Sequence, residues 1–272
     1  MIGKLQNRKK VGLALGSGSA RGLAHVGVIK SLIKHHIPID YLAGTSIGAW
    51  VAVYFALHKD IEEVEAKMVG FKKEKLRAFF EPTLRGGFIK GKKIEKLFYE
   101  WFGNVHFNQL LIPTTVVATD LISGKEVDID SGLVVPAVRA SVSIPAVFQP
   151  VQIGKHLLVD GAITNAVPDD VAKRMGADVV IAVNLDKHFI HQEFKTDRLL
   201  LRKTVTRSLD ILRYHLTEHS TKTAHIMIEP KIDLYWFSGW KQYFQENTSQ
   251  HMVDIGEQTM DEYIPEVKRL LE

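Results

Sequence analysis

The sequence predicts an α/β protein, a sandwich in which helices cover a largely parallel sheet. Strand and helix signals alternate from about residue 10 to residue 185, which is typical of that fold class. Glycine-rich turns, at residues 16–22 and 44–48, directly follow the first two expected strands. No linker, internal repeat or low-complexity tract divides the chain, so we expect a single domain over residues 1–272.

The first half of the chain alternates between short apolar strands and longer apolar helices. Residues 10–15 and 39–43 are expected to be buried strands, and Pro38 ends the helix between them. The helices expected before the third strand are residues 20–36, residues 47–57, and two or three pieces that reach residue 102 and are separated by Pro82 and by Gly86 and Gly87.

The second half continues the same pattern. The β-branched run at residues 114–119 indicates a strand, and residues 125–129 alternate like its partner. The further strands expected are residues 147–153 and 156–159, which turn at Gly154, and residues 178–185 and 225–228. The further helices expected are residues 134–143, 169–175, 196–223 and 249–271. Residues 186–272 form a helical C-terminal part that carries no assignable motif.

The composition is that of a soluble globular protein. Of the 272 residues, 46% are hydrophobic and 24% are charged, and the formal net charge is +4. The absence of cysteine excludes disulfides, thiolate zinc sites and a cysteine nucleophile, and it suits a reducing compartment. The apolar run at residues 11–15 is too short for a signal peptide, and the run at 42–57 is shorter than a membrane span. We therefore expect a cytoplasmic protein.

Two stretches could meet lipid. Residues 67–101 contain ten Lys and Arg but only four Glu, and eight aromatic residues are interleaved with these charges up to residue 102. This stretch is either a lid whose cations face lipid phosphate at the inner membrane face, or helical core with a solvated charged side. The aromatic cluster at 235–244 could dip into a membrane interface, cover the site, or be core or an oligomer contact. No motif accompanies the positive charge that would indicate nucleic acid as a partner, and the oligomeric state stays open.

The most informative motif is Gly-Thr-Ser-Ile-Gly at residues 44–48, which places Ser46 between an expected strand and an expected helix. A serine at such a turn has a strained backbone and an exposed Oγ, the geometry of a nucleophile elbow. Gly44 and Gly48 flank it because a Cβ there would collide with the neighbouring elements. The alternative is a tight glycine turn with an inactive serine.

A second motif, Gly-Ser-Gly-Ser-Ala-Arg-Gly at residues 16–22, follows the first strand and can expose backbone N–H groups to a ligand. A dinucleotide fingerprint would need its third glycine at position 21, which is Arg, and a P-loop would need a Gly-Lys-Ser/Thr ending that is absent. An oxyanion hole is the interpretation that fits best, because the next strand ends in the serine elbow. The structural role of Arg21 would be to hold this loop, the alternative being contact with a lipid phosphate.

Ser46 needs a base. None of the twelve histidines lies in a characteristic motif, and His25, in the first helix, fits a structural role. Asp160 is the better candidate, because it ends a strand and is followed by Gly161, which lets it approach a neighbouring loop. As a base it would need burial, a raised pKa or a very short contact with the serine Oγ. A simple turn aspartate is the alternative.

Four ordered motifs resemble those of patatin-like phospholipases, and most closely the small bacterial branch related to the catalytic domain of neuropathy target esterase. The motifs are residues 16–22, residues 44–48, Ala-Ser-Val-Ser-Ile-Pro at 140–145, and Asp-Gly-Ala at 160–162. The resemblance covers residues 10–185 and implies a three-layer α/β/α sandwich. It also implies a Ser–Asp dyad of Ser46 and Asp160 that acts on lipid acyl esters.

The resemblance further implies which residues surround the dyad. Backbone N–H groups of Gly16, Ser17, Gly18 and Ser19 would form the oxyanion hole, and Ser17 departs from the commoner run of three glycines. The residues expected to support the loops are Arg21, Gly22, Gly44, Gly48 and Gly161.

We predict a phospholipase- or lysophospholipase-type hydrolase with no metal and no organic cofactor. An acyltransferase, a Ser-His-Asp esterase, and a protein that binds acyl lipid or nucleotide without turnover are the alternatives. Acyl-chain and headgroup preferences are left open.

Overall fold

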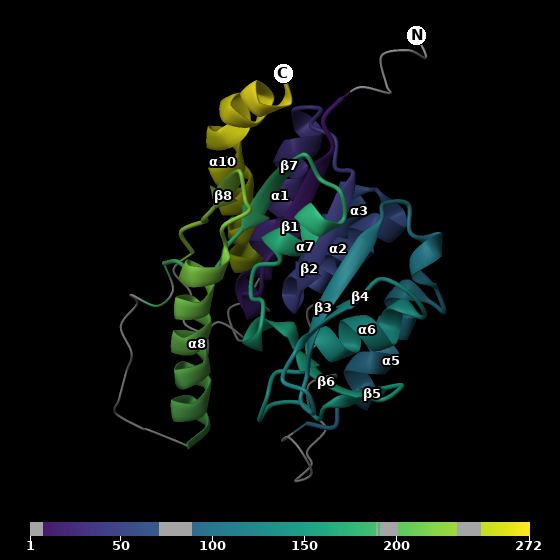
Figure 1. The fold of residues 1–272 in the computed structure, drawn as a ribbon. Helices are drawn as coiled ribbons and strands as arrows, with labels where there is room; N and C mark the ends of the chain where they lie inside the picture. The colour runs from purple at the N-terminus through teal and green to yellow at the C-terminus, as the bar shows by residue number, and fades with distance from the viewer. Residues whose placement is uncertain (1–7, 71–88, 189, 191–200, 233–245) are drawn as a thin grey trace.

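Within the part of the chain that the structure describes, a single eight-stranded sheet forms the centre (Figure 1). The structure is a computed structural model that describes residues 8–70, 89–188, 190, 201–232 and 246–272. The strands are hydrogen-bonded to one another along the path β5-β6-β3-β2-β1-β7-β8, and β4 also pairs with β3. They are β1 (Val11–Leu15), β2 (Tyr41–Thr45), β3 (Thr114–Asp120), β4 (Glu126–Ile129), β5 (Val151–Ile153), β6 (His156–Asp160), β7 (Val179–Val183) and β8 (Ile226–Ile228).

Helices cover both faces of this sheet. The α-helices are α1 (Leu23–Lys34), α2 (Ile47–His58), α3 (Ile61–Gly70), α5 (Lys92–Phe102), α6 (Val134–Ser141), α7 (Asp169–Arg174), α8 (Leu201–Ser220) and α10 (Glu246–Leu271). Short 3₁₀ turns are η2 (Ser19–Gly22), η3 (Phe107–Gln109) and η4 (Gly161–Ile163). None of the helices in the described parts of the chain is long and apolar enough to cross a lipid bilayer.

Alternation along the strands separates two hydrophobic cores. On β1, Leu13 and Leu15 pack into the large core under α1, α2 and α10, whereas Ala14 packs with Val171 and Ala172 of α7 on the opposite face. Successive strand residues point to opposite faces of a sheet, so these runs must be apolar throughout. The predicted three-layer α/β/α sandwich with a mainly parallel sheet is confirmed.

The sheet changes from parallel to antiparallel at β3. Strands β3, β2, β1, β7 and β8 are parallel neighbours, whereas β4 and β6 pair antiparallel with β3. β4 occupies one edge of β3, along residues 116–119. β2 and β6 must therefore both pair with the other edge of β3. On that edge β2 ends opposite Val117 and β6 ends opposite Ala118. The carboxyl ends of β2 and β6 therefore meet at adjacent residues of β3.

The stretch predicted to be either lid or core is core where the structure describes it. On α5, Phe98, Trp101 and Phe102 are buried, and the rings of Phe98 and Trp101 lie 4.9 and 5.2 Å from that of Trp50 on α2. Such edge and tilted aromatic contacts stabilise a packed interior. The aromatic residues between 71 and 88, and the cluster at 235–244, lie outside the described residues.

The helix α10 packs along α1, so two helices that are far apart in the sequence are in contact. An ideal Cβ built on Gly27 would lie 1.9 Å from the carbonyl oxygen of Val253, and one built on Gly256 would lie 2.1 Å from that of Ala24. The two helix backbones are thus in direct contact. The Oγ of Ser31 on α1 also donates a hydrogen bond to Asp261 on α10 at 2.6 Å. The extent of a single domain over residues 1–272 stays a prediction.

Candidate active site

Ser46 occupies the turn between β2 and α2 in a conformation that is rare for a residue with a side chain. Its φ is 56° and its ψ is −122°, which puts a non-glycine residue at positive φ. The turn is held by Ser141 of α6, whose Oγ accepts a hydrogen bond from the Ser46 N–H at 2.8 Å and donates one to the Val117 carbonyl at 2.6 Å. The strained elbow is therefore tied to β3 by one buried hydroxyl.

The glycines predicted to support the loops lie where a side chain would have no room. A Cβ on Gly48 would lie 2.0 Å from the carbonyl oxygen of Leu15, so α2 begins directly against the end of β1. Added Cβ atoms would come similarly close to other groups, within 2.0 to 2.5 Å, at Gly22, Gly44 and Gly161. Larger side chains at these positions would push the elbow, the glycine loop and β6 apart.

Asp160 lies against Ser46 because β2 and β6, which lead to these two residues, end side by side on the same edge of β3. The Ser46 Oγ donates a hydrogen bond to Asp160 Oδ2 at 2.7 Å, and the second carboxylate oxygen accepts one from the N–H of Ala162 at 2.9 Å. Asp160 is 3% exposed and Ser46 is 5% exposed. The two predicted residues, 114 positions apart in sequence, thus form one buried hydrogen-bonded pair.

The surroundings of Asp160 make it a better base than an ordinary aspartate. Burial raises the pKa of Asp160 from 3.8 to about 6, although hydrogen bonds from Ser46 and Ala162 and the positive charge of Arg213 oppose the rise. A carboxylate with a pKa closer to neutrality accepts a proton from a hydroxyl more readily than one with a pKa near 4.

In the glycine loop, residues 16–19, the N–H groups do not all face the same way. The N–H of Gly16 donates to the Val183 carbonyl at 3.1 Å, and that of Ser17 donates to the Ala166 carbonyl at 2.8 Å. Within the described chain the N–H groups of Gly18 and Ser19 have no backbone acceptor of this kind. Of the four predicted oxyanion-hole residues, Gly16 and Ser17 are therefore held by their N–H groups to the fold, and Gly18 and Ser19 are the better donor candidates.

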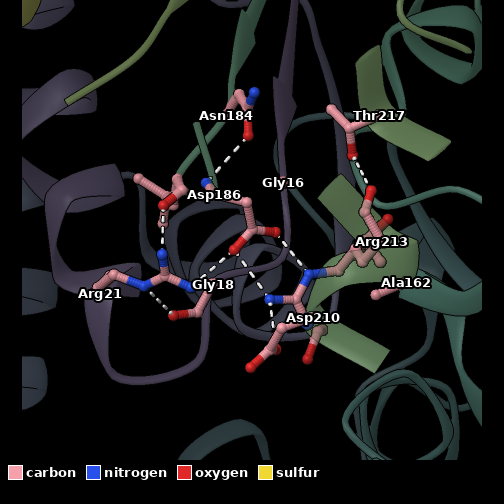
Figure 2. Close-up of polar contacts among 12 residues, drawn as sticks. Gly16, Gly18, Arg21, Ala162, Asn184, Asp186, Asp210, Arg213 and Thr217 are labelled. Carbon is pink, nitrogen blue, oxygen red and sulfur yellow. Dashed lines mark hydrogen bonds and ion pairs between the residues drawn. The ribbon is translucent and has the colours of Figure 1, made fainter. Parts of the chain in front are cut away.

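Arg21, which the sequence suggested as a supporting residue, contacts this loop from within. Its buried guanidinium donates to the carbonyls of Gly18 and Leu185 at 3.2 and 2.6 Å, and it forms an ion pair with Asp186 at 2.7 Å (Figure 2). His25 is also buried, and its Nε2 lies 2.7 Å from the Gly16 carbonyl oxygen. Burial lowers the pKa of His25 to about 4, so it is a neutral structural side chain.

A cavity of about 300 Å³ opens onto the Ser46–Asp160 pair. On one side it is lined by Ser17, Gly18 and Ser19 of the glycine loop. Apolar side chains form much of the remaining wall, namely Ile144, Pro145, Ile163, Leu209, Leu212 and Leu216. Among the described residues no histidine lines this cavity, and no group of three or more acidic or histidine side chains is arranged to hold a metal ion.

The sequence reasoning missed several residues at this site, among them Ser141, Asp186 and Arg213. Ser141 lies in a recognised motif, but its contact with the elbow depends on how α6 packs. Asp186 follows a buried strand and Arg213 interrupts the apolar face of α8, and both are the kind of polar residue in an apolar setting that could have drawn attention. Their mutual ion pair, at 2.5 Å, joins segments that sequence cannot pair.

Replacing Ser141 with Ala should weaken both the fold and the site. The change leaves the Ser46 N–H and the Val117 carbonyl without their buried partner, which should lower the free energy of unfolding by about 2 kcal/mol. The loosened elbow should lower kcat for ester hydrolysis roughly tenfold. Urea unfolding and ester hydrolysis measure the two effects, with the exposed Ser208→Ala on α8 as the control. Wild-type values for Ser141→Ala would contradict this role.

Comparisons with known proteins agree with the fold. Residues 13–173 match the family model described as patatin-like phospholipase. The chain is 36% identical over 178 residues to an uncharacterized NTE family protein of Mycobacterium tuberculosis, which covers 65% of this chain and 49% of that protein. It is 31% identical over 183 residues to neuropathy target esterase sws of Drosophila melanogaster, which covers 64% of this chain and 13% of that protein. The match thus spans about half the length of the bacterial relative.

A solved structure shows the same fold at low sequence identity. VipD from Legionella pneumophila superposes with a TM-score of 0.59 and 12% identity, over 97% of this chain and 67% of that one. The matched family model covers the glycine loop, the serine elbow and Asp160 in one continuous stretch. This chain therefore belongs to the patatin-like phospholipase family.

Proposed function

We propose that this protein hydrolyses carboxylic esters of lipids, with Ser46 as the nucleophile and Asp160 as the base. The observation that carries the proposal is the 2.7 Å hydrogen bond from the Ser46 Oγ to the buried Asp160 carboxylate, at the wall of the cavity. Membership of a family of phospholipases supports a lipid ester as substrate. The neuropathy target esterase among the relatives supports the same class of reaction.

The proposed reaction has two halves that share the same groups. The Ser46 Oγ attacks the ester carbonyl carbon while Asp160 accepts the hydroxyl proton, and the N–H groups of Gly18 and Ser19 stabilise the oxyanion. The tetrahedral intermediate expels the alcohol, which takes the proton from Asp160, and leaves an acyl group on Ser46. Asp160 then accepts a proton from a water molecule as that water attacks the acyl carbon. Collapse releases the carboxylic acid and returns the proton to Ser46.

The apolar wall of the cavity fits the acyl chain of such a substrate. Leucine side chains of α8 line the cavity together with Ile144 and Pro145. A volume of about 300 Å³ is at the lower end of the range of ligand pockets, so the wall would hold one chain, not two. A monoacyl substrate, such as a lysophospholipid, is therefore the proposed preference.

Labelling with a fluorophosphonate probe tests the proposal most directly. A serine that is activated by a base beside an oxyanion site should form a covalent adduct, and mass mapping should locate it at Ser46 and not at Ser17 or Ser19. Heat-denatured protein is the control, since it should remain unlabelled. An adduct that maps to another serine would contradict the assignment, as would intact protein that stays unlabelled, with and without detergent, while a known serine hydrolase reacts in parallel.

Product analysis separates hydrolysis from the alternatives. An acyltransferase would pass the acyl group of Ser46 to an added alcohol in preference to water, so it would release little free fatty acid. A protein that binds acyl lipid without turnover would retain the ester intact.

A further inference from the structure

At the edge of the proposed site, four charged side chains form a buried network that the reaction above does not use (Figure 2). Two of them, Asp210 and Arg213, also line the cavity. Asp186, which follows β7, lies between Arg21 of the glycine-loop turn η2 and Arg213 of α8. Asp210 completes the network one turn before Arg213 on α8, with a contact of 3.0 Å. The two cations and two anions balance, and none of the four side chains is more than 16% exposed.

The geometry of Asp186 depends on Arg213. The Nε of Arg213 donates to Asp186 Oδ2 at 2.5 Å and its Nη2 donates to Oδ1 at 2.9 Å, which is a bidentate pair. The same Oδ1 accepts a hydrogen bond from Arg21 Nη2 at 2.7 Å. The two hydrogen bonds from the Arg213 guanidinium therefore fix the plane of the Asp186 carboxylate, and with it the position of the Oδ1 atom that binds Arg21.

Arg21 passes this constraint to the glycine loop. Its guanidinium binds the Gly18 carbonyl at 3.2 Å and the Leu185 carbonyl at 2.6 Å. The peptide that follows Gly18 carries the N–H of Ser19, so the Gly18 carbonyl and one proposed oxyanion donor belong to the same planar unit. A change in the position of Arg21 would rotate that donor.

We propose that Arg213 is a positioning residue for the proposed ester hydrolysis: by clasping Asp186 it holds Arg21, and through Arg21 the oxyanion-binding peptides of the glycine loop. The assignment rests on the proposed function. It gives a role to α8, which lies beyond residues 13–173 that match the family model. Buried ion pairs gain little net stability over the cost of desolvation, so the network acts chiefly by fixing geometry.

Arg213 also acts on the base by its charge. The pKa of Asp160 is raised by burial, lowered by Arg213 and raised by Asp186, the charged groups that face it from α8 and from the end of β7. Removing the cation at position 213 takes away one of the interactions that lower the pKa of Asp160, so this pKa should rise further.

Two substitutions separate geometry from charge. Arg213→Met removes both, so kcat should fall by about 10²-fold, because small displacements of catalytic groups have effects of that size. The acid limb of kcat/KM should also move up by roughly one pH unit, since the cation near Asp160 is lost. Arg213→Lys keeps the charge but loses the bidentate fork, so kcat should fall roughly tenfold while the acid limb stays in place. Hydrolysis of p-nitrophenyl butyrate and the rate of fluorophosphonate labelling at Ser46 are the readouts.

Glu218→Gln is the matched control, because it breaks an exposed ion pair between α8 and Lys187 without touching the network. It should leave kcat and the pH profile unchanged. Wild-type kcat in both Arg213 variants would overturn the proposal. A second result would also overturn it: an Arg213→Met variant whose pH profile is not shifted and whose loss of activity is no greater than its loss of folded protein, as measured by circular dichroism. Wild-type protein that neither labels nor hydrolyses esters would overturn the proposed function, and this assignment with it.

Discussion

Replacing Asp160 with Asn is expected to lower kcat by at least about 10⁴-fold while the protein stays folded. The amide has the size of the carboxylate, so it can still accept the Ala162 N–H and contact the Ser46 Oγ. It cannot accept a proton, however, and no histidine lines the cavity among the described residues to replace it. Hydrolysis of a short-chain ester, measured with the purified variant, checks the expected loss.

The same substitution should stabilise the fold at neutral pH. Burial raises the pKa of Asp160 to about 6, so the native protein holds this proton more tightly than the unfolded chain, in which the pKa is near 3.8. The contribution of this group to the free energy of unfolding therefore falls as the pH rises from about 4 to 6 and remains low above that. Asn has no such penalty, so the stability advantage of Asp160→Asn should grow over that range to as much as about 3 kcal/mol.

Asp128→Asn provides the matched control for both measurements. Asp128 lies on β4 in an exposed ion pair with Arg174, away from the cavity, so its loss should leave kcat unchanged. If Asp160→Asn kept kcat within about tenfold of the wild type, a barrier change below 1.4 kcal/mol, another group would be the base. A stability difference that did not vary with pH would contradict the raised pKa.

Replacing Gly256 with Ala is expected to have the largest effect on stability. Its Cβ would lie 2.1 Å from the Ala24 carbonyl oxygen, in a contact between two helix backbones that has no flexible side chain to yield. Helices α1 and α10 would have to separate, and the buried Met252, Val253 and Met260 would lose their packing. The expected loss is about 3 kcal/mol, which should lower Tm by roughly 10 °C.

Gly70→Ala is the control, because a Cβ there would meet none of the described residues within 4 Å and Gly70 has no positive φ. It should change the free energy of unfolding by less than about 0.5 kcal/mol. Thermal unfolding of the two variants beside the wild type makes the comparison. Equal Tm values for Gly256→Ala and the wild type would mean that the helices are not in the described contact.

The sequence allowed the class of the fold and most of its elements to be predicted, because the controlling signals are local. The apolar run of β1, the stop at Pro38 and the β-branched run of β3 each depend on a few neighbouring residues. The antiparallel pairing of β6 with β3 could not be derived, since the sequence around β6 specifies a strand but not its neighbour. Helix ends also shifted, as at α10, which begins at Glu246 and continues through Pro265.

The candidate site was predictable in part for the same reason. Ser46, Asp160 and the glycine loop are marked by short motifs, and their assigned roles stay predictions until they are tested. Which N–H groups of the loop face the cavity depends on acceptors supplied by β7 and the turn after η4, far away in sequence. The network depends on Arg213, which lies more than 160 residues after Ser46 in the sequence, so no local pattern could have placed it.

The meeting of β2 and β6 on one edge of β3 has a consequence for the evolution of this family. The distance between the Ser46 and Asp160 side chains is set by β3, a strand that contributes neither of them. One residue inserted between Val117 and Ala118 would move the two strand ends about 3.3 Å further apart, enough to break the 2.7 Å hydrogen bond between Ser46 and Asp160. A relative could therefore keep every motif intact and still lose the contact between its serine and its aspartate through a single insertion in the strand that corresponds to β3.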